Sequence, residues 1–269
     1  GIVLQKQGKL AEGVSSIQKS FALRNGLSSQ EEDVLSPATT GLFFELTNKC
    51  NFHCLFCPSD SQKRDLGSMD FDLVKRLYDE AAEKKIASVV NLHLMGEPTL
   101  HPKLIDVLKY AASKKVKTDL VTNGSTLVGK VVPRIFDALY GTIIASHMTP
   151  TENSYQYRGE VGLSWDRYIG NLRFLVREHL KRMARGTETR NNVVIRVLAT
   201  KNTHANVSVN DSEEEAKSIL KEWIDFVSEV ERELGLSPFK RRDVESGEIL
   251  QGNSRSSISY PLQQRLKLT

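Results

Sequence analysis

The sequence predicts an α/β fold with a parallel sheet, and three observations carry this prediction. Short runs rich in β-branched and aliphatic residues alternate along most of the chain with stretches that have helical spacing. The helical stretches are long enough to connect parallel strands, which need a crossover of a dozen or more residues. The chain of 269 residues is also long enough to bury a sizeable core.

Five runs have the composition of buried strands. The clearest of them contains Val193, Val194 and Ile195, which are β-branched and favour extended backbone. The five runs, in chain order, are residues 42–46, 88–95, 117–122, 142–148 and 193–200. A sixth strand is expected near residues 239–244. Parallel strands joined in this way place all their carboxyl ends at one edge of the sheet.

Five stretches have the apolar spacing of helices. In the first, aliphatic side chains recur at intervals of three and four residues: Leu73, Val74, Leu77 and Ala81. Pro102 is expected at the first position of the second helix, Ser164 as the N-cap of the fourth, and Gly235 at the end of the fifth. The five predicted helices are residues 71–84, 102–114, 131–139, 165–183 and 212–234.

The two ends of the chain differ from this alternating region. Residues 1–36 are expected to form a helical N-terminal segment, with helical spacing over residues 4–23, followed by a polar, acidic linker. Residues 37–245 form the predicted core domain. Residues 246–269 have no clear periodicity and are expected to be an irregular tail.

Composition narrows the class of protein. Hydrophobic residues at 39% and charged residues at 26% are typical of a globular protein and not of a disordered one. No apolar run reaches the roughly 18–20 residues that cross a bilayer, so we expect no membrane span. Lys and Arg number 37 against 33 Asp and Glu, a net charge of +4, and the basic residues are dispersed. A nucleic-acid partner is therefore not favoured.

The three cysteines are the most informative residues, because Cys50, Cys54 and Cys57 lie within eight consecutive positions. An odd number cannot form a closed disulfide framework, and reduced thiols fit the cytoplasm, where we expect the protein to be. The C-x3-C-x2-C spacing places three thiolates on one loop, and thiolates favour zinc or an iron–sulfur cluster. Structural zinc prefers four protein ligands, and His53 adjoins Cys54 too closely to be the fourth. Three thiolates fit a cubane cluster with one iron left open.

Polar motifs follow the next strands in chain order. They are Met95-Gly96-Glu97-Pro98, Thr122-Asn123-Gly124 and Ser146, and Arg158 and Arg196 are further candidates. Taken singly, each motif could be an ordinary turn, a small strand residue or an ion-pair partner. The carboxyl ends of parallel strands meet at one edge, so the motifs and the cysteines are expected to converge there.

These residues resemble the signature of radical S-adenosylmethionine (SAM) enzymes. The resemblance covers about residues 42–202 and implies a partial (β/α)6 barrel similar to a TIM barrel. It also implies that Cys50, Cys54 and Cys57 hold a [4Fe–4S] cluster whose fourth iron is chelated by SAM. Reductive cleavage of SAM would then give a 5′-deoxyadenosyl radical that abstracts hydrogen from a substrate.

The same resemblance implies contacts with SAM. Phe56 would lie near the adenine, and the Gly96-Glu97-Pro98 motif would hold the amino group, although Met95 replaces the first glycine of the family motif. Ser146 matches a serine that often meets the ribose or carboxylate. Asn123, Arg158 and Arg196 complete the expected SAM site. No residue is assigned to the chemistry on the substrate.

The substrate and partners stay open. Cys57-Pro58 followed by Arg64, Gly67 and Met69 resembles the SPASM and sulfatase-maturase branch, whose members modify peptides or sugars. That branch commonly carries a cysteine-rich extension, whereas no cysteine follows Cys57, so the chain is either truncated or works with one cluster. We expect a peptide, sugar or small-molecule substrate and an electron donor such as flavodoxin or ferredoxin. The alternatives are a non-catalytic scaffold that binds zinc or a cluster, and a relative that binds SAM without turnover.

Overall fold

The computed structural model describes residues 41–159, 162–186, 191–197, 200–202, 207–209 and 212–236, and the backbone of three short strands after residue 248. The helix expected over residues 4–23, the linker after it and the strand expected near residues 239–244 lie outside the described residues.

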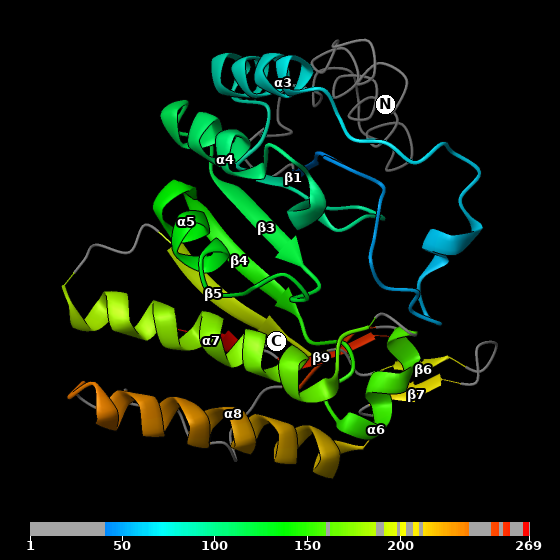
Figure 1. The fold of residues 1–269 in the computed structure, drawn as a ribbon, viewed down its shortest axis with the longest axis vertical. Helices are drawn as coiled ribbons and strands as arrows, with labels where there is room; N and C mark the ends of the chain where they lie inside the picture. Colours follow the sequence, from blue (N-terminus) through cyan, green and yellow to red (C-terminus); the bar gives the residue numbers. More distant parts are fainter. Residues whose placement is uncertain are drawn as a thin grey trace, which may run out of the picture.

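A parallel sheet forms the centre of the described structure (Figure 1). Its strands are β1 (Gly41–Phe43), β2 (Val89–Asn91), β3 (Thr118–Thr122), β4 (Gly141–Ser146), β5 (Asn191–Arg196) and β10 (Leu266–Leu268). They pair in the order β1-β2-β3-β4-β5-β10, and every neighbouring pair is parallel. β1 and β10 are the two edges, so the sheet is open. The predicted α/β fold with parallel strands is confirmed.

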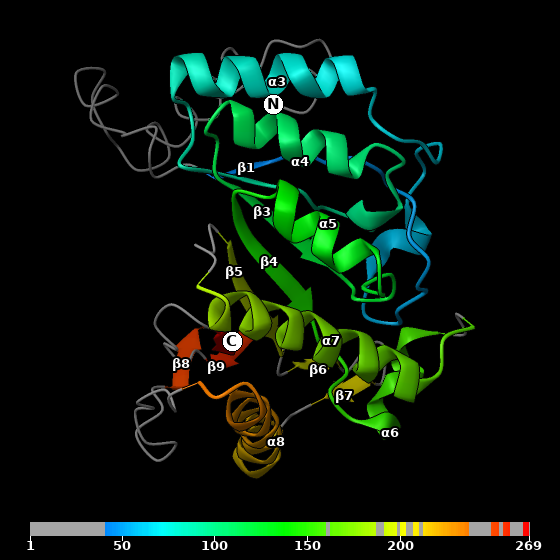
Figure 2. The same cartoon turned by 60° about the vertical axis from the view of Figure 1, so that its left-hand side comes forward.

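Helices cover one face of this sheet (Figures 1 and 2). They are α3 (Phe71–Lys84), α4 (Leu104–Ser113), α5 (Val131–Ala138), α7 (Trp165–Ala184) and α8 (Glu213–Glu233). Neighbours along the chain pack side by side, since α3 contacts α4, α4 contacts α5, and α7 contacts both α5 and α8. This is the arrangement that repeated right-handed βαβ units produce.

Alternation along the strands separates two faces of the sheet. Side chains such as Leu120 and Ile143 point toward the helices and join them in one large buried core. Val121, Ile144 and Val194 lie in register on neighbouring strands and form a second, small apolar cluster on the opposite face. The polar residues that alternate with the core residues therefore also point to that second face.

Local sequence signals place the helix ends. Asp70 caps α3 by accepting hydrogen bonds from the backbone N–H groups of Asp72 and Leu73, and the helix has the predicted bounds. Ser164 caps α7 by accepting from the N–H of Arg167, also as predicted. Gly235 follows α8 with φ of 65°, a left-handed conformation that glycine adopts easily.

The second predicted helix begins later than expected. α4 starts at Leu104 with Lys103 at its N-cap, so Pro102 precedes the helix instead of occupying its first position. The cause is a separate turn at His101, whose ring Nδ1 accepts a hydrogen bond from the N–H of Lys103 at 3.2 Å. That bond holds residues 101–103 outside the helix.

Short elements complete the described chain. They are the 3-10 turns η3 (Pro58–Ser61), η4 (Pro98–Leu100) and η5 (Gln156–Arg158), the helix α6 (Glu152–Tyr155), and the strands β6 (Thr200–Asn202), β7 (Val207–Val209), β8 (Ile249–Gly252) and β9 (Arg255–Ile258). β8, β9 and β10 lie within the predicted irregular tail, so that part of the chain contains extended segments. Among the described helices, none is both long and apolar enough to cross a bilayer.

Candidate functional site

The cysteine loop, defined as residues 50–57, follows β1 at the carboxyl end of the sheet (Figure 1). All three thiols are half-buried. The backbone N–H of Cys57 donates to the carbonyl of Cys54 at 2.9 Å, and this bond turns the chain so that the last two cysteines lie on one bend. Cys57 then occupies the N-cap position of η3, without a capping side-chain hydrogen bond, and Pro58 is the first residue of that turn. A proline at the start of the turn directs the chain away from the loop.

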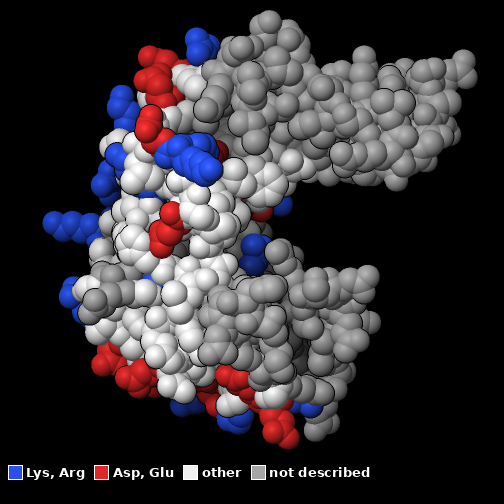
Figure 3. All heavy atoms as spheres, turned by 90° about the vertical axis from the view of Figure 1, so that its right-hand side faces the viewer, with Lys and Arg blue, Asp and Glu red and all other residues white. Residues whose placement is uncertain are grey.

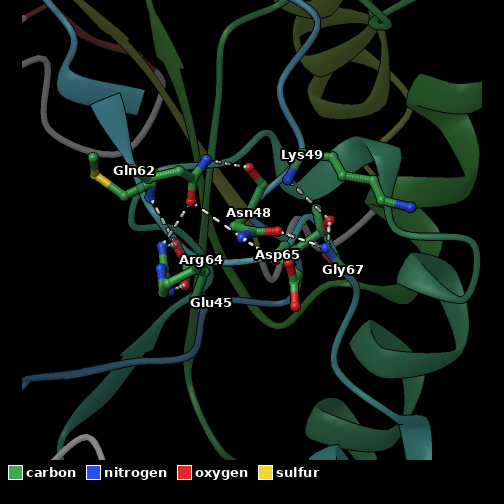
Figure 4. Close-up of polar contacts among 9 residues, drawn as sticks. Glu45, Asn48, Lys49, Gln62, Arg64, Asp65 and Gly67 are labelled. Carbon is green, nitrogen blue, oxygen red and sulfur yellow. Dashed lines mark hydrogen bonds and ion pairs between the residues drawn. The ribbon is translucent and has the colours of Figure 1, made fainter. Parts of the chain in front are cut away.

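The two ends of the loop are joined by a network that we call the neck (Figure 4). Asn48 lies before the cysteines, and its side chain donates to Gln62 Oε1 at 3.1 Å and to the Asp65 carbonyl at 2.9 Å. Its Oδ1 accepts from the N–H of Gly67 at 2.7 Å. Gln62 Nε2 returns a bond to the Asn48 carbonyl at 3.2 Å. A single buried amide therefore closes the loop at its base.

An ion pair continues the neck toward β2. Arg64 pairs with Glu45 and also donates from Nη2 to Gln62 Oε1 at 3.1 Å (Figure 4). The same Glu45 carboxylate accepts from the backbone N–H of Met95 at 3.1 Å. The segment after β1, the segment after η3 and the segment after β2 are thus tied together.

Gly96 shows how closely these segments approach. A Cβ atom at Gly96 would lie 2.1 Å from the Thr47 carbonyl oxygen and 2.8 Å from the Lys49 carbonyl oxygen. No side chain fits there, because both neighbours are backbone. The next residue, Glu97, donates its N–H to the same Lys49 carbonyl at 2.8 Å. The predicted Gly-Glu-Pro motif therefore lies directly against the start of the cysteine loop.

The Glu97 side chain points inward, with only 2% of its surface exposed. Its Oε1 accepts from the N–H of Thr99 at 3.0 Å and from the hydroxyls of Thr99 and Thr122 at 2.6 and 2.7 Å. Its Oε2 accepts from the N–H of Asn123 at 2.6 Å. Burial raises the pKa of this carboxyl, and the four hydrogen bonds oppose that rise. Glu97 joins the turn after β2 to the turn after β3, and buried Pro98 begins η4 beside it.

The turn after β3 reaches the cysteine loop through Asn123. Its Nδ2 donates to Asn51 Oδ1 at 3.0 Å and to the sulfur of Cys50 at 3.7 Å. Asn51 also donates to the Ser125 hydroxyl at 2.9 Å. Asn51 and Ser125 are site residues that the sequence did not indicate, since amides and hydroxyls in loops carry no pattern. The sequence could have indicated them only by their position, since Asn51 follows Cys50 and Ser125 follows the Thr122-Asn123-Gly124 motif.

Residues 155–159, which we call the strap, hold the other side of the loop. The N–H groups of His53 and Leu55 donate to the carbonyls of Arg158 and Tyr157 at 3.1 and 2.9 Å. Gly159 has φ of 75°, and a Cβ there would lie 2.7 Å from the His53 carbonyl oxygen. A glycine is therefore required where the strap leaves the loop.

The Arg158 guanidinium is buried behind the loop, with 2% of the residue exposed. Nε donates to the Thr149 hydroxyl at 2.9 Å, and Nη2 donates to the Ser146 carbonyl at 2.6 Å and the Tyr168 hydroxyl at 2.9 Å. The rings of Phe52 and Tyr168 each lie 5.1 Å from the guanidinium carbon.

The remaining predicted residues lie around the same edge. Ser146 ends β4 and is in register with Arg196 at the end of β5, and both side chains are partly exposed. Burial lowers the pKa of Arg196, and the nearby Asp119 charge opposes this. Phe56 is half-buried in the loop. The structure thus joins Glu97 to Asn123 and Asn123 to Cys50 by hydrogen bonds. Among the described residues, Phe56 and Arg196 lie near the edge without a hydrogen bond to the other predicted residues.

A cavity of 680 Å³ opens beside the neck. Its lining combines apolar side chains such as Phe43 and Leu94 with the charged pair Glu45 and Arg64. Figure 3 shows this side of the molecule, where Lys and Arg are scattered among acidic and uncharged residues of the described surface. They do not gather into one basic patch there.

The thiol pKa values of Cys50 and Cys54 are shifted by different surroundings. Burial raises the pKa of the Cys54 thiol to about 11, and the charge and hydrogen bond of Arg158 oppose this rise. Burial also raises the pKa of Cys50, and the negative charge of Glu97 adds to it. The cysteines raise one another's pKa, so their sulfurs lie within electrostatic reach of each other.

Sequence comparison identifies the class of protein that has this fold and loop. The family model of the Radical SAM superfamily matches residues 44–196, more than half of the chain, from just after β1 to the end of β5. The chain therefore belongs to the radical SAM superfamily. The predicted resemblance, including the likeness to the SPASM and maturase branch, is confirmed, and with it the predicted class of enzyme.

Individual relatives match a shorter part of the chain than the family model does. The chain is 27% identical over 94 residues to the tungsten-containing aldehyde ferredoxin oxidoreductase cofactor-modifying protein of Pyrococcus furiosus, covering 35% of this chain and 26% of that protein. It is 35% identical over 94 residues to mycofactocin maturase MftC of Mycobacterium tuberculosis, covering 35% and 24%. It is 33% identical over 107 residues to the PqqA peptide cyclase of Methylorubrum extorquens, covering 39% and 26%. The matches span about a quarter of these curated relatives.

Two solved structures share the fold. Streptococcus suis SuiB bound to precursor peptide SuiA superposes with a TM-score of 0.50 at 19% identity, covering 72% of this chain and 38% of that one. HydG, a maturase of the [FeFe]-hydrogenase, superposes with a TM-score of 0.51 at 14% identity, covering 78% and 43%. The predicted partial barrel is confirmed as an open α/β arrangement of this type.

Family membership implies an iron–sulfur cluster and SAM. The donor set fits such a cluster, because three thiols lie on one anchored loop beside a buried cation. As the side chains lie, no three Cys, His, Asp or Glu residues in the described part of the chain form a ready metal site.

Proposed function

We propose that Cys50, Cys54 and Cys57 hold a [4Fe–4S] cluster that binds SAM at its fourth iron, and that the enzyme modifies a peptide. When bound, this cluster supplies an electron that splits SAM into methionine and a 5′-deoxyadenosyl radical, which abstracts hydrogen from the substrate. The observation that carries the proposal is the cysteine loop, which carries all three thiols and is held by the neck, by Asn123 and by the strap.

The chain's own residues position these groups. The neck and the strap fix the loop, so the thiols start from one defined backbone conformation. Gly96 and the backbone around it are assigned to the SAM amino group, because the Glu97 carboxylate is already bound by four donors. Ser146 is assigned to the ribose or carboxylate and Phe56 to the adenine, since both lie at the edge where parallel sheets bind ligands.

The peptide substrate is supported by the relatives. One is named a peptide cyclase and another a maturase, and the matched region is about a quarter of each of these proteins. A sugar or small molecule would need the same open sheet face. Arg196 remains a candidate for either SAM or substrate, because the described residues give it no hydrogen bond. We further propose a small electron-transfer protein, flavodoxin or ferredoxin, as the reductant.

Anaerobic reconstitution tests the proposal. The parent chain is expected to become brown, to bind about four iron and four sulfide, and to give an EPR signal that SAM changes. Cys54→Ala should lose the cluster, whereas the control His53→Ala should keep it, because the exposed His53 ring pairs with no described side chain other than Asp60. A colourless parent with stoichiometric zinc would support the scaffold instead, and a cluster-bearing parent that yields no 5′-deoxyadenosine would support loss of turnover.

A further inference from the structure

We propose that Arg196 and His93 form a binding site for a carboxylate of the substrate, on the face of the sheet opposite the described helices (Figures 1 and 2). This inference rests on the proposed function and deepens it, because it assigns an acidic group to the substrate. The carboxylate belongs either to an acidic side chain of a peptide or to the end of its chain.

Both side chains lie on this second face. On β5, Ile195 belongs to the large core, so Arg196 alternates to the opposite side. Just after β2, Leu92 belongs to the same core, so His93 also alternates to the second face. The small apolar cluster of β3, β4 and β5 lies on that face as well. The two polar side chains therefore share one side of the sheet with an apolar surface.

Arg196 carries a positive charge that no described residue neutralises by contact. The half-buried side chain makes no ion pair and no hydrogen bond within the described part of the chain. Asp119 is the acidic residue whose charge influences it, but Asp119 Oδ1 accepts from the backbone N–H of Thr142 at 3.1 Å and is held against β4. A guanidinium stays charged at any ordinary pH, so Arg196 favours an anionic ligand.

The guanidinium leans away from the cysteine loop. Ser146 is the register partner of Arg196. Asp119 pairs with Thr142, four residues before Ser146 on β4. A strand rises about 3.3 Å per residue, so the Arg196 charge influences Asp119 because the side chain turns back along the face. The same charge lowers the pKa of His93, although β3 and β4 separate their strands. A ligand of Arg196 therefore lies over the sheet, behind the edge assigned to SAM.

His93 supplies an uncharged hydrogen-bond donor on this face. Its Nδ1 is buried and has no hydrogen-bond partner among the described residues. Buried donors without a partner are rarer than buried acceptors without one, so we place the ring proton on Nε2. Burial and the charge of Arg196 lower the pKa of the ring, and the charge of Glu45 opposes this, so the ring is neutral at pH 7. Nε2–H can then donate to a carboxylate oxygen.

The surroundings of His93 also leave room for the carbon chain of a substrate. The His93 ring lies 5.9 Å from the ring of Phe43, which is 49% exposed. Phe43, Glu45 and Leu94 line the 680 Å³ cavity beside the neck, so the cavity reaches the residues that flank His93. A cation, a neutral donor and apolar surface together recognise a carboxylate on a carbon chain.

Carboxylate probes test this site in the metal-free full chain. N-acetylglutamate α-methylamide represents a side chain, and N-acetyl-leucyl-alanine represents a chain end. The matched controls are the corresponding glutamine compound and C-terminal amide, and saturation-transfer NMR measures each affinity. At least one acid should bind with a Kd of about 1–10 mM, and its amide control should not bind. The acid that binds identifies the source of the carboxylate. Binding of neither acid, or equal binding of acid and amide, would overturn the proposal.

Variants locate the binding. Arg196→Gln should weaken the acid probe about tenfold or more, and Arg196→Lys should retain most of the affinity. His93→Phe should weaken the probe about two- to fivefold, because it removes one donor. Asp119→Asn should tighten binding by a similar factor, because it removes a competing negative charge. Parent affinity in Arg196→Gln or in His93→Phe would overturn the proposal.

Titration of the reconstituted chain with SAM separates this role from a SAM contact. Arg196→Gln should bind SAM as tightly as the parent, since the guanidinium leans away from the edge assigned to SAM. A tenfold loss of SAM affinity would instead assign Arg196 to SAM and overturn the proposal. If the parent assembles no cluster, the proposed function fails, whereas the titration of the metal-free chain still decides whether the carboxylate site exists.

Discussion

Buried ionisable side chains surround the cysteine loop, and each has its own means of tolerating burial. Glu97 accepts four hydrogen bonds, so its lone pairs face donors on two turns. Arg158 uses hydroxyls, a carbonyl and ring faces. His147 stays neutral between two tryptophan rings. Changing any of these groups alters stability as well as the site, so the two effects must be measured separately.

Glu97→Gln is expected to lower the free energy of unfolding of the metal-free chain by about 2 kcal/mol. The amide oxygen can replace Oε1, but the amide NH2 would face the N–H of Asn123, which is itself a donor. Urea unfolding at neutral pH measures the change. Glu83→Gln, at an exposed position on α3, serves as the control and should be close to the parent. Equal stabilities of all three chains would mean that Glu97 does not join the two turns.

His147 predicts a pH dependence of stability. Burial lowers the pKa of this ring to about 3, and the charges of Arg158 and Arg173 add to the effect. Protonation therefore favours the unfolded chain, where the pKa is about 6.5. The contribution of the neutral His147 ring to the free energy of unfolding is fully present above pH 6.5. It is lost as the pH falls toward 3, at up to about 1.4 kcal/mol per pH unit.

Urea unfolding of the parent and His147→Gln at pH 7, 6, 5 and 4 checks this. The stability of the parent should fall more steeply between pH 6 and pH 4, by a slope difference of roughly 1 kcal/mol per pH unit. Parallel curves would show that His147 becomes protonated without cost in the folded chain.

Among the structural elements, the cysteine loop depends most on contacts outside itself. It has no strand or helix within residues 50–57, and its own backbone supplies few of its hydrogen bonds. The neck, the turn after β3 and the strap replace the missing regular structure. A loop held in this way should become mobile when one anchor is removed, although the sheet behind it stays intact.

Asn48→Ala tests the neck. The change removes three side-chain hydrogen bonds at the base of the loop and leaves the partner groups unpaired. Trypsin cleavage after Lys63 and Arg64 in the metal-free chain should become about tenfold faster. Ser61→Ala is the matched control, because among the described residues its exposed hydroxyl bonds within η3, to the Pro58 carbonyl. Equal cleavage rates of the two variants would show that the neck does not limit the local opening that exposes Lys63 and Arg64 to trypsin.

In the whole molecule, an open sheet with helices on one face needs its outermost helix to be firmly packed. α8 is joined to α7 by ion pairs such as Arg173 with Glu222 and by the buried ring of Trp223, which is 3% exposed. The ring contacts His147 edge-on at 5.7 Å, so α8 also covers the end of β4. Exposed ion pairs contribute little, and apolar burial contributes most of the docking energy.

Trp223→Ala should therefore lower the free energy of unfolding by about 3–5 kcal/mol, whereas Glu222→Ala should cost less than about 1 kcal/mol. Urea unfolding measures both, and added salt should reduce only the small effect of Glu222→Ala. A larger loss from Glu222→Ala than from Trp223→Ala would contradict this order.

Much of the fold could be predicted because its signals are local. The spacing of Val74, Leu77 and Ala81 predicted α3, since the buried face of a helix repeats every three to four residues. α6 and the 3-10 turns were missed, because elements of three or four residues are too short to have a period. The motifs at the strand ends were recognisable as types, but their orientation was not: the inward Glu97 and the buried Arg158 depend on contacts with residues distant in the sequence.

The anchors of the cysteine loop also have a consequence for the order of folding. Asn51 and Cys50 bond to residues 72 to 74 positions later, and His53 bonds to the strap, which comes after β4. Contacts across such distances form after local ones, because closing a long loop costs chain entropy. The three cysteines are therefore among the first residues of the core to be synthesised and among the last to reach their final places. Metal delivered before β4 has joined the sheet would meet a loop of the right composition without its geometry.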